Sequence, residues 1–286
     1  MNSPQVAAPP AVLARQSFIE MSARERARSL LDPHGQRELL GPFDGLYSPW
    51  LPRQGIVPQA DDGVVVLRGT LAGREAVALA LEGRFQGGSI GEVCGAKIAA
   101  ALELALRDCE AARPVLPLLL LETGGVRLQE ANLGLAAIAE IQAAVVALRR
   151  HVPVIAVAAG MVGCFGGMSL VAALCSYIVM TRQARLGMNG PEVIEQEAGV
   201  DELDAADRRL VWSLIGGEQR VATGLADALV DDDAPRLRGQ LLDLVQRPLP
   251  QPRSRQVGRW RERVEALAGQ ADLGPAQLRR LWRPES

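Results

Sequence analysis

The sequence is short of aromatic residues and of lysine. Phe, Trp and Tyr together make up only 3% of the 286 residues, whereas 48% are hydrophobic. A core of this composition must be built mainly from Ala, Val, Leu and Ile. Lys97 is the only lysine, so arginine carries almost all of the positive charge, as a GC-rich coding sequence would produce. The formal net charge of −2 and the pI near 5.9 exclude the strongly basic surface that is typical of nucleic-acid-binding proteins.

Cysteine and histidine are equally sparse, and their spacing predicts no metal site. The four cysteines form no CxxC pair, which excludes a zinc ribbon, and a chain of this length needs no disulfide to stabilise its core. We therefore expect reduced, mostly buried thiols. His34 lies in a turn and His151 before an apolar run, and we expect both histidines to serve structure. The cysteines are Cys94, Cys109, Cys164 and Cys175.

The sequence contains no segment that is typical of a signal peptide or a membrane helix. Residues 1–16 have no basic cluster followed by an apolar stretch. The most apolar stretch, residues 152–180, is interrupted by glycines and carries Ser169, Ser176 and Tyr177. It therefore lacks the about 20 consecutive apolar residues of a membrane helix. We expect no membrane contact and a cytoplasmic location.

Apolar runs of strand length alternate with helical patterns through the middle of the chain. Residues 64–67 and 76–81 predict two strands joined as a hairpin. Starting with the second of these strands, the succession of buried strand, glycine-rich turn and helix occurs three times. Continuous apolar strands and crossover helices are typical of a mostly parallel sheet, which predicts an α/β fold. The further strands are expected at residues 114–121, 152–158 and 177–181, and the helices at residues 92–108, 130–150 and 168–175.

Composition divides the chain into three parts. The first is rich in Pro and Ala and is expected to be flexible, the second holds the strand-and-helix pattern, and the third is rich in Pro and Arg. Near the start of the second part, Ser22 and Glu25 match a helix capping box. Its last helices are expected at residues 201–214 and 235–245. The three parts are residues 1–16, 17–246 and 247–286.

Three glycine-rich turns are the strongest functional signal in the sequence. Each follows a predicted strand and opens onto a helix. Ligands bind at the carboxyl edge of α/β sheets, where helix N-termini present free backbone N–H groups. Glycine lets a ligand oxygen approach the backbone closely, so two such turns side by side could form an oxyanion hole. The turns are residues 83–91, 122–127 and 160–167.

Other uses of these turns stay open from the residues alone. The glycines could serve only tight turns or close helix packing. A phosphate cradle lacks support, because the chain has neither GxxxxGK[ST] nor GxGxxG after a strand. Cys164 lies inside the third turn and is the best candidate for a nucleophilic thiol, but no histidine is near it in the sequence. Glu122 and Glu130 flank the second turn, and Glu130 could simply cap a helix.

Five ordered motifs occur between about residues 20 and 235. They are residues 23–32 (ARERARSLLD), 87–98 (GGSIGEVCGAKI), 123–130 (TGGVRLQE), 186–196 (LGMNGPEVIEQ) and 224–230 (GLADALV). Together they resemble motifs of the acyl-CoA carboxyltransferases of the crotonase-like superfamily, and the second and third resemble that family's GGSMG…GAR and SGGARMQE. Several ordered motifs are far more specific than any one alone.

The resemblance implies a crotonase fold with repeated ββα units, in which backbone N–H groups hold a thioester carbonyl. Carried over by motif, it implies a first pair of donors at Gly125 and Val126. It implies a second pair at Gly166 and Gly167, in a turn that departs from the family's GGVSASF in spacing and composition. It also implies substrate-binding positions at Gly87, Gly88, Gly124, Arg127, Cys164 and Phe165.

Two departures narrow the resemblance to one branch of the family. The chain lacks the four-cysteine zinc ribbon of the acetyl-CoA carboxylase β subunit, and it has room for one crotonase domain where propionyl-type carboxyltransferases have two. In both respects it is similar to the β subunits of biotin-independent malonate decarboxylases. The resemblance implies decarboxylation of a malonyl thioester to an acetyl thioester and CO2, with no biotin and no metal on this chain.

The same resemblance implies that the chain works in a complex. A crotonase-like γ subunit would complete the site, an acyl-carrier subunit would deliver the malonyl group on a coenzyme-A-like phosphopantetheine arm, and an α transferase subunit would belong to the same assembly. Two alternatives stay open. One is a carboxyltransferase β-type subunit of a biotin-dependent acyl-CoA carboxylase, and the other is a non-catalytic subunit that only completes the site of its partner.

Overall fold

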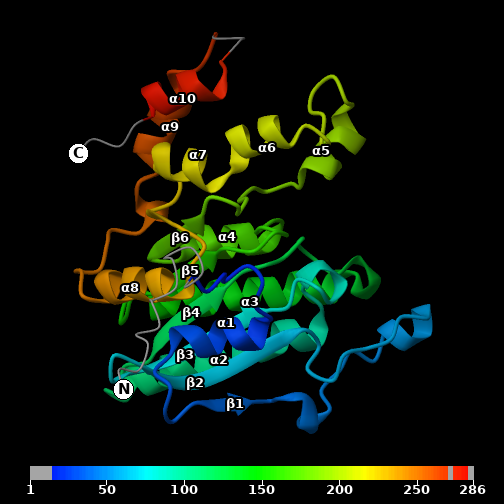
Figure 1. Ribbon diagram of the computed structural model, residues 1–286, viewed down its shortest axis with the longest axis vertical. Helices are drawn as coiled ribbons and strands as arrows, with labels where there is room; N and C mark the ends of the chain where they lie inside the picture. Colours follow the sequence, from blue (N-terminus) through cyan, green and yellow to red (C-terminus); the bar gives the residue numbers. More distant parts are fainter. Residues whose placement is uncertain (1–14, 270–272, 283–286) are drawn as a thin grey trace, which may run out of the picture.

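The computed structural model describes residues 15–269 and 273–282 and is built around one seven-stranded sheet (Figure 1). The strands lie in the order in which they occur in the chain. Strand β2 is antiparallel to its neighbours β1 and β3, and β3 to β7 are parallel, which confirms the predicted α/β class. They are β1 (Arg37–Leu39), β2 (Val64–Leu71), β3 (Arg74–Leu81), β4 (Leu116–Leu120), β5 (Ile155–Ala158), β6 (Tyr177–Thr181) and β7 (Ala228–Val230).

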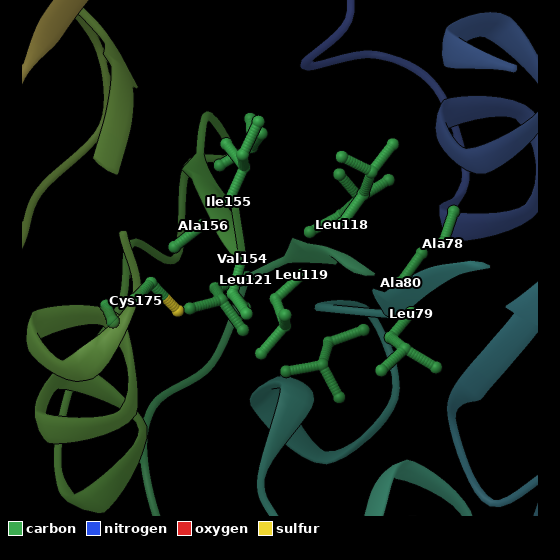
Figure 2. Packing of buried hydrophobic residues seen from close by; sticks show 14 of the residues in the cluster. Ala78, Leu79, Ala80, Leu118, Leu119, Leu121, Val154, Ile155, Ala156 and Cys175 are labelled. Atoms are coloured by element: carbon green, nitrogen blue, oxygen red, sulfur yellow. The ribbon is translucent and has the colours of Figure 1, made fainter. Parts of the chain in front are cut away.

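The central strands are buried on both faces. Every residue of β4, β5 and β6 is buried. Figure 2 shows Leu118 and Leu119, which are consecutive in β4, pointing to opposite sides of the sheet into packed apolar side chains. Because successive strand residues face opposite sides, continuous burial requires helices on both faces. The continuous apolar runs in the sequence therefore follow from this architecture.

Two pairs of helices cover the sheet. Helix α1 (Ala23–Leu30) packs against α8 (Ala234–Val245), and α2 (Glu92–Glu110) packs against α3 (Asn132–Leu148). Both α1 and α2 contact β2, β3 and β4. The shorter α4 (Gly167–Leu174) packs against α3 and completes the third unit of strand, turn and helix. The three predicted repeats of this unit are confirmed.

The remaining helices form a separate layer beyond the β6–β7 end of the sheet (Figure 1). The structure begins α6 at Arg208 rather than at residue 201, because the side chain of Asp207 accepts a hydrogen bond from Leu210 N at 2.9 Å and caps the helix there. The expectation of one helix over residues 201–214 was therefore wrong in its first half. The layer consists of α5 (Pro191–Ala198), α6 (Arg208–Ile215), α7 (Gly217–Ala222), α9 (Val257–Glu265) and α10 (Pro275–Leu281).

The two ends of the chain lie only partly within the described residues. Most of the first expected part, residues 1–16, lies outside the described residues. The capping box is confirmed, because Ser22 N donates to Glu25 Oε2 at 2.8 Å and Glu25 N donates to Ser22 Oγ at 3.3 Å. In the third part, Arg253 donates to the carbonyl oxygen of Cys175 at 3.0 Å, so this segment contacts the end of α4. The division at residue 246 stays a prediction.

The β2–β3 hairpin is held to the rest of the domain by Asp32. Its carboxylate accepts hydrogen bonds from Thr70 Oγ1 at 2.7 Å, from Gly73 N at 2.9 Å and from Ala72 N at 3.1 Å. Arg238 of α8 donates to the same carboxylate at 2.5 Å. The hydrogen bond from the Gly73 N–H and the others together lower the pKa of Asp32 to about 2. This carboxylate therefore joins the end of α1, the hairpin and α8.

We predict that Asp32→Ala lowers the free energy of unfolding by about 1–2 kcal/mol at neutral pH, because a charged acceptor of several hydrogen bonds is lost. The pKa of Asp32 in the folded protein lies below the ordinary aspartate value of 3.8, so the stabilisation is present above pH 4 and is lost as the pH falls toward 2. Urea unfolding between pH 7 and pH 2 measures both effects. Asp243→Ala, at an exposed position of α8, should change little at any pH. A constant difference between wild type and Asp32→Ala at all pH values would contradict this account.

Candidate functional site

The three glycine-rich turns meet at the carboxyl edge of the parallel strands. The turn of residues 83–91 follows β3, that of residues 122–127 follows β4, and that of residues 160–167 follows β5. Isolated parallel bridges join Ile90 to Val126 and Thr123 to Cys164, so each turn pairs with the next as the strands do. The sequence-based expectation that the turns lie side by side is confirmed.

The second and third turns touch through glycine backbone. A Cβ added to Gly166 would lie 2.9 Å from the Cα of Gly125, and one added to Gly125 would lie 3.5 Å from the Cα of Gly166. Gly125 has φ of 123° and Gly166 has φ of 60°, a region that side chains disfavour. Both the contact and the conformation therefore require glycine at these two positions.

Two of the four predicted N–H donors are already used within the chain. Gly125 N donates to Thr123 Oγ1 at 3.1 Å, and Gly166 N donates to the carbonyl oxygen of Met188 at 2.8 Å. Within residues 15–269 and 273–282, the N–H groups of Val126 and Gly167 have no acceptor. Val126 and Gly167 are thus the candidates for an oxyanion hole, and Gly125 and Gly166 shape the turns that present them.

The Gly167 N–H belongs to the N-terminus of a helix. Gly166 is the N-cap of α4 and offers no side chain to cap it, and Ser169 N closes the first turn on Gly166 O at 3.0 Å. The first N–H groups of a helix have no intrahelical acceptor and carry a partial positive charge. The Gly167 N–H is therefore suited to a negative oxygen.

The first turn lies against the second through Gly87, Gly88 and Gly124. Gly124 N donates to Gly87 O at 2.8 Å, and Gly88 N donates to Phe85 O at 2.9 Å. A Cβ on Gly88 would overlap the carbonyl oxygen of Glu122, whereas one on Gly87 would meet nothing within 4 Å. Gly87 and Gly124 are exposed at the edge of the site, and Gly88 is buried beneath it. Gly88 therefore packs closely against the second turn, and its assignment to substrate binding stays a prediction.

The side chain of Arg127 is buried and ion-paired within the protein. Its side chain is 1% exposed and forms ion pairs with Asp62 at 2.8 Å and Glu130 at 2.9 Å. The guanidinium also lies 5.3 Å from the centre of the Phe85 ring. These partners occupy the guanidinium inside the protein, and the sequence-based assignment of Arg127 to substrate binding stays a prediction.

Cys164 and Phe165 are the buried residues of the third turn that precede its two glycines. Cys164 is fully buried, and this burial raises the pKa of its thiol, so a thiolate nucleophile at this position is disfavoured. Phe165 is also buried, and the guanidinium of Arg185 lies 5.5 Å from the centre of its ring. In this chain both side chains support the turn from below. Cys164 N donates to Arg185 O at 2.9 Å, which fixes the turn to the segment that follows β6.

Several residues that support the site were not singled out in the sequence. Thr123 accepts the Gly125 N–H, Met188 accepts the Gly166 N–H, and Ile90 pairs with the backbone on both sides of Val126. Glu122, which was noted beside the second turn, is buried and pairs with Arg26 of α1. Thr123 and Met188 lie inside motifs that carry the family resemblance, which is the signal that could have found them.

The chain belongs to the carboxyl transferase domain family, whose model matches residues 20–263. Its sequence is 39% identical over 284 residues to the malonyl-S-ACP:biotin-protein carboxyltransferase MADC of Malonomonas rubra, covering 94% of this chain and 89% of that protein. The solved structures with a similar fold are crotonase-fold proteins, which confirms the predicted fold.

The solved structures narrow the similarity further. A chain of the Pseudomonas malonate decarboxylase hetero-tetramer, crystallised in complex with malonate, matches with a TM-score of 0.93 and 61% identity, over 95% of this chain and 99% of that one. A chain of the Pseudomonas malonate decarboxylase MdcD-MdcE hetero-dimer matches with a TM-score of 0.76 and 54% identity, over 90% of this chain and 100% of that one. The resemblance to malonate decarboxylase subunits, inferred from the motifs, is confirmed.

The described part of the chain contains neither a metal-binding cluster nor a helix that could cross a membrane. Among residues 15–269 and 273–282, no group of three or more His, Cys, Asp or Glu side chains is arranged to hold a metal ion. None of the described helices has both the length and the apolar character that crossing a membrane requires.

We predict that Gly88→Ala and Gly87→Ala differ sharply in stability. Both glycines have φ near +60°, so each alanine brings a similar backbone strain of about 1–2 kcal/mol. Only the alanine at position 88 would also collide with the Glu122 carbonyl. Denaturant unfolding should therefore show a further loss of about 2 kcal/mol or more, typical of an overpacked position, in Gly88→Ala. Equal losses in the two variants would show that the first turn does not rest on the second as described.

Proposed function

We propose that this chain is the subunit of a malonate decarboxylase that stabilises the enolate formed when a malonyl thioester on an acyl carrier loses CO2. The observation that carries the proposal is the junction of the two glycine-rich turns, where the N–H groups of Val126 and Gly167 have no acceptor among the described residues. The similarity to malonate decarboxylase chains at 61% and 54% identity supports the choice of reaction.

The chemistry needs little more than such a hole. When the bond between the carboxylate carbon and the methylene carbon breaks, its electron pair moves into an enolate whose negative charge rests on the thioester oxygen. Two rigid N–H groups directed at that oxygen lower the barrier, because they interact more strongly with the enolate than with the neutral carbonyl. Protonation of the methylene carbon then gives the acetyl thioester.

The proton is supplied from outside the turns. The Cys164 thiol is buried, and Arg127 is held in ion pairs. His151 precedes β5 and so lies at the opposite end of that strand from the turn of residues 160–167. We therefore assign the proton donor to the partner subunit or to water. No step requires a metal or biotin on this chain.

One relative favours a second candidate function. The relative from Malonomonas rubra is described as transferring the carboxyl group from malonyl-S-ACP to a biotin protein. The same hole would serve that reaction, because carboxyl transfer also passes through an acetyl thioester enolate. The two functions differ in whether CO2 is released or passed to biotin, and biotin dependence therefore separates them.

We further propose that a γ-type subunit covers the face around the glycine turns. Large apolar side chains are exposed there, the most exposed being Leu128, at 85%, directly after the second turn. The segment of residues 41–57, here called the arm, projects from the body of the domain beside this face (Figure 1). Phe43 is fully exposed on the arm. Further exposed apolar side chains follow or belong to the turns, namely Met161 in the third turn, Leu133 and Leu135 at the start of α3, Leu170 of α4, and Met188.

The arm is anchored next to the site. Trp50 Nε1 donates to Glu92 Oε2 at 2.5 Å, and Gln54 Nε2 donates to Gln129 O at 2.6 Å. A partner seated on the turns would therefore meet the arm as well. The MdcD-MdcE structure is a hetero-dimer, which supports a partner of this kind. We also assign an acyl-carrier subunit, bearing the phosphopantetheine group, and an α transferase subunit to the complex.

We assign the protein to the cytoplasm, because the free thiols of this chain suit a reducing compartment.

The proposed function is tested with Gly167→Pro. Gly167 is the first residue of α4, where proline is tolerated and where it removes only an N–H that has no acceptor in the described residues. We expect CO2 release from malonyl-acyl carrier, with the γ-type subunit and with avidin present to sequester biotin, to fall about 100-fold or more in kcat. Circular dichroism checks the fold.

Gly167→Ala is the matched control. It brings the same Cβ contact with Ile138 but keeps the N–H, so it should lose far less activity than the proline variant. Equal losses in both would remove the N–H from the mechanism, and an active proline variant would favour a subunit that only completes its partner's site. If wild type releases no CO2 until a biotinylated carrier protein is added, the carboxyltransferase function replaces the decarboxylase.

We predict that Leu128→Asp and Phe43→Asp each weaken binding of the γ-type subunit by at least about tenfold, because a buried charge replaces an apolar contact. Isothermal titration calorimetry measures the affinity. Val257→Asp, at an exposed apolar position of α9 in the separate helical layer, is the control and should bind as wild type does. Unchanged affinity in Leu128→Asp would place the partner elsewhere.

A further inference from the structure

A buried ionic cluster lies directly behind the proposed Val126 donor. Arg127 is its centre, and Asp62 and Glu130 pair with the same Nη1 atom at 2.8 and 2.9 Å. All three side chains are at most 1% exposed. The buried ammonium of Lys97 also interacts electrostatically with Asp62. Burying each carboxylate is costly unless further donors satisfy it, so the other donors to Asp62 and Glu130 matter.

Both carboxylates also cap the N-terminus of α2. Asp62 Oδ2 accepts from Cys94 N at 2.9 Å, and Glu130 Oε2 accepts from Glu92 N at 2.6 Å. These are N–H groups of the first turn of the helix, and the helix N-terminus favours negative charge. The N-terminus of α2 is therefore filled from within the protein. It serves as an anchor for the cluster rather than as a site for ligand.

The backbone of Val126 is held from both sides by Ile90, the residue that leads into α2. Ile90 N donates to Gly125 O at 2.8 Å, and Arg127 N donates to Ile90 O at 2.8 Å. These two bonds direct the intervening Val126 N–H away from Ile90. The space behind them is closed, because a Cβ on Gly134 would overlap Ile90 O and one on Gly91 would overlap the Glu130 carboxylate. The turn cannot shift unless the cluster shifts with it.

The pKa shifts of Arg127 and Glu130 fit this role, whereas burial raises the pKa of Asp62 above its ordinary value. Burial would lower the pKa of Arg127, but neighbouring groups, Asp62 and Glu130 among them, raise it above its ordinary value. Burial likewise acts to raise the pKa of Glu130, but hydrogen bonds from Ser48 and from the Glu92 N–H outweigh it and lower that pKa. Arg127 and Glu130 therefore stay charged near neutral pH, and the Arg127–Glu130 ion pair persists there.

We propose that Asp62 and Glu130 are positioning residues, which act through Arg127 and the N-terminus of α2 to hold the Val126 N–H in the direction that the enolate oxygen requires. This inference rests on the proposed function for its catalytic meaning. A merely structural cluster would affect stability and would leave the turnover of the folded enzyme unchanged. A positioning cluster would lower kcat in variants that still fold.

The test uses Glu130→Gln and Asp62→Asn, which keep the shape of each side chain and remove its charge. We expect kcat for CO2 release by the assembled enzyme to fall about 10-fold to 100-fold, because small displacements of a catalytic group have effects of this size. KM should stay within about twofold, because the interaction that is weakened stabilises the transition state and not the bound substrate. Asp61→Asn is the matched control.

Asp61 is an adjacent, equally buried carboxylate, but it pairs with Arg24 at 3.0 Å and does not contact Arg127. Asp61→Asn should therefore lose stability without losing kcat. The proposal is overturned if folded Glu130→Gln turns over as wild type does, or if Asp61→Asn loses as much kcat. Should both variants of the cluster fail to fold, Arg127→Lys, which keeps the charge and loses the two-sided pairing, takes their place with the same expectation.

A second readout does not depend on catalysis. Amide hydrogen exchange of Ile90 and Arg127, whose N–H groups hold the turn, should be at least about tenfold faster in Glu130→Gln than in wild type and unchanged in Asp61→Asn. If the wild-type enzyme releases no CO2, the proposed function fails while this measurement still decides whether the cluster fixes the turn. Unchanged exchange at both amides would overturn the proposal whatever the activity.

Discussion

The contact between two backbones that carry no side chains, at Gly125 and Gly166, is the constraint on which the site depends. Parallel strands bring the carboxyl ends of β4 and β5 to one edge, and the turns that follow must then share very little space. Glycine at both positions lets them touch, and the remaining polar groups of each turn are absorbed by Thr123 and Met188. The two N–H groups that are left over lie on adjacent turns because the backbones could approach so closely.

Most of the fold could be predicted from the sequence, because the signals involved are local. The continuous apolar strands β4, β5 and β6 and the glycine turns between them have patterns that need no knowledge of the partner elements. β1 and β7 were missed, since three residues are too few to show a period and both depend on pairing with a neighbouring strand. The start of α6 was also missed, because it is set by a single side-chain cap at Asp207.

The sequence could predict which turns form the candidate site, but not which of their N–H groups are free to bind a ligand. Motif and spacing identified the glycines at which the second and third turns meet, yet they could not show which N–H groups are already bonded, because the acceptor at Met188 is more than twenty residues away in sequence. Arg127 illustrates the same limit. An arginine within a functional motif suggests an anion ligand, whereas here it is enclosed by Asp62, which precedes it by 65 residues. The direction of a side chain is a property of tertiary packing.

Two reactions are named among the relatives, decarboxylation of malonate and carboxyl transfer to a biotin protein. In physical terms, one kind of site could serve both. Both reactions generate the enolate of an acetyl thioester, and a pair of fixed N–H groups stabilises it irrespective of where the CO2 goes. In the proposed mechanism this chain stabilises charge at its glycine turns, while the Cys164 thiol is buried and Arg127 is held in ion pairs. Selection between the two outcomes must therefore come from whatever lies across the turns. Under the proposed function, the choice of reaction then lies with the proposed partner at the face where Leu128 is exposed and beside which the arm carries Phe43, rather than with the proposed oxyanion hole.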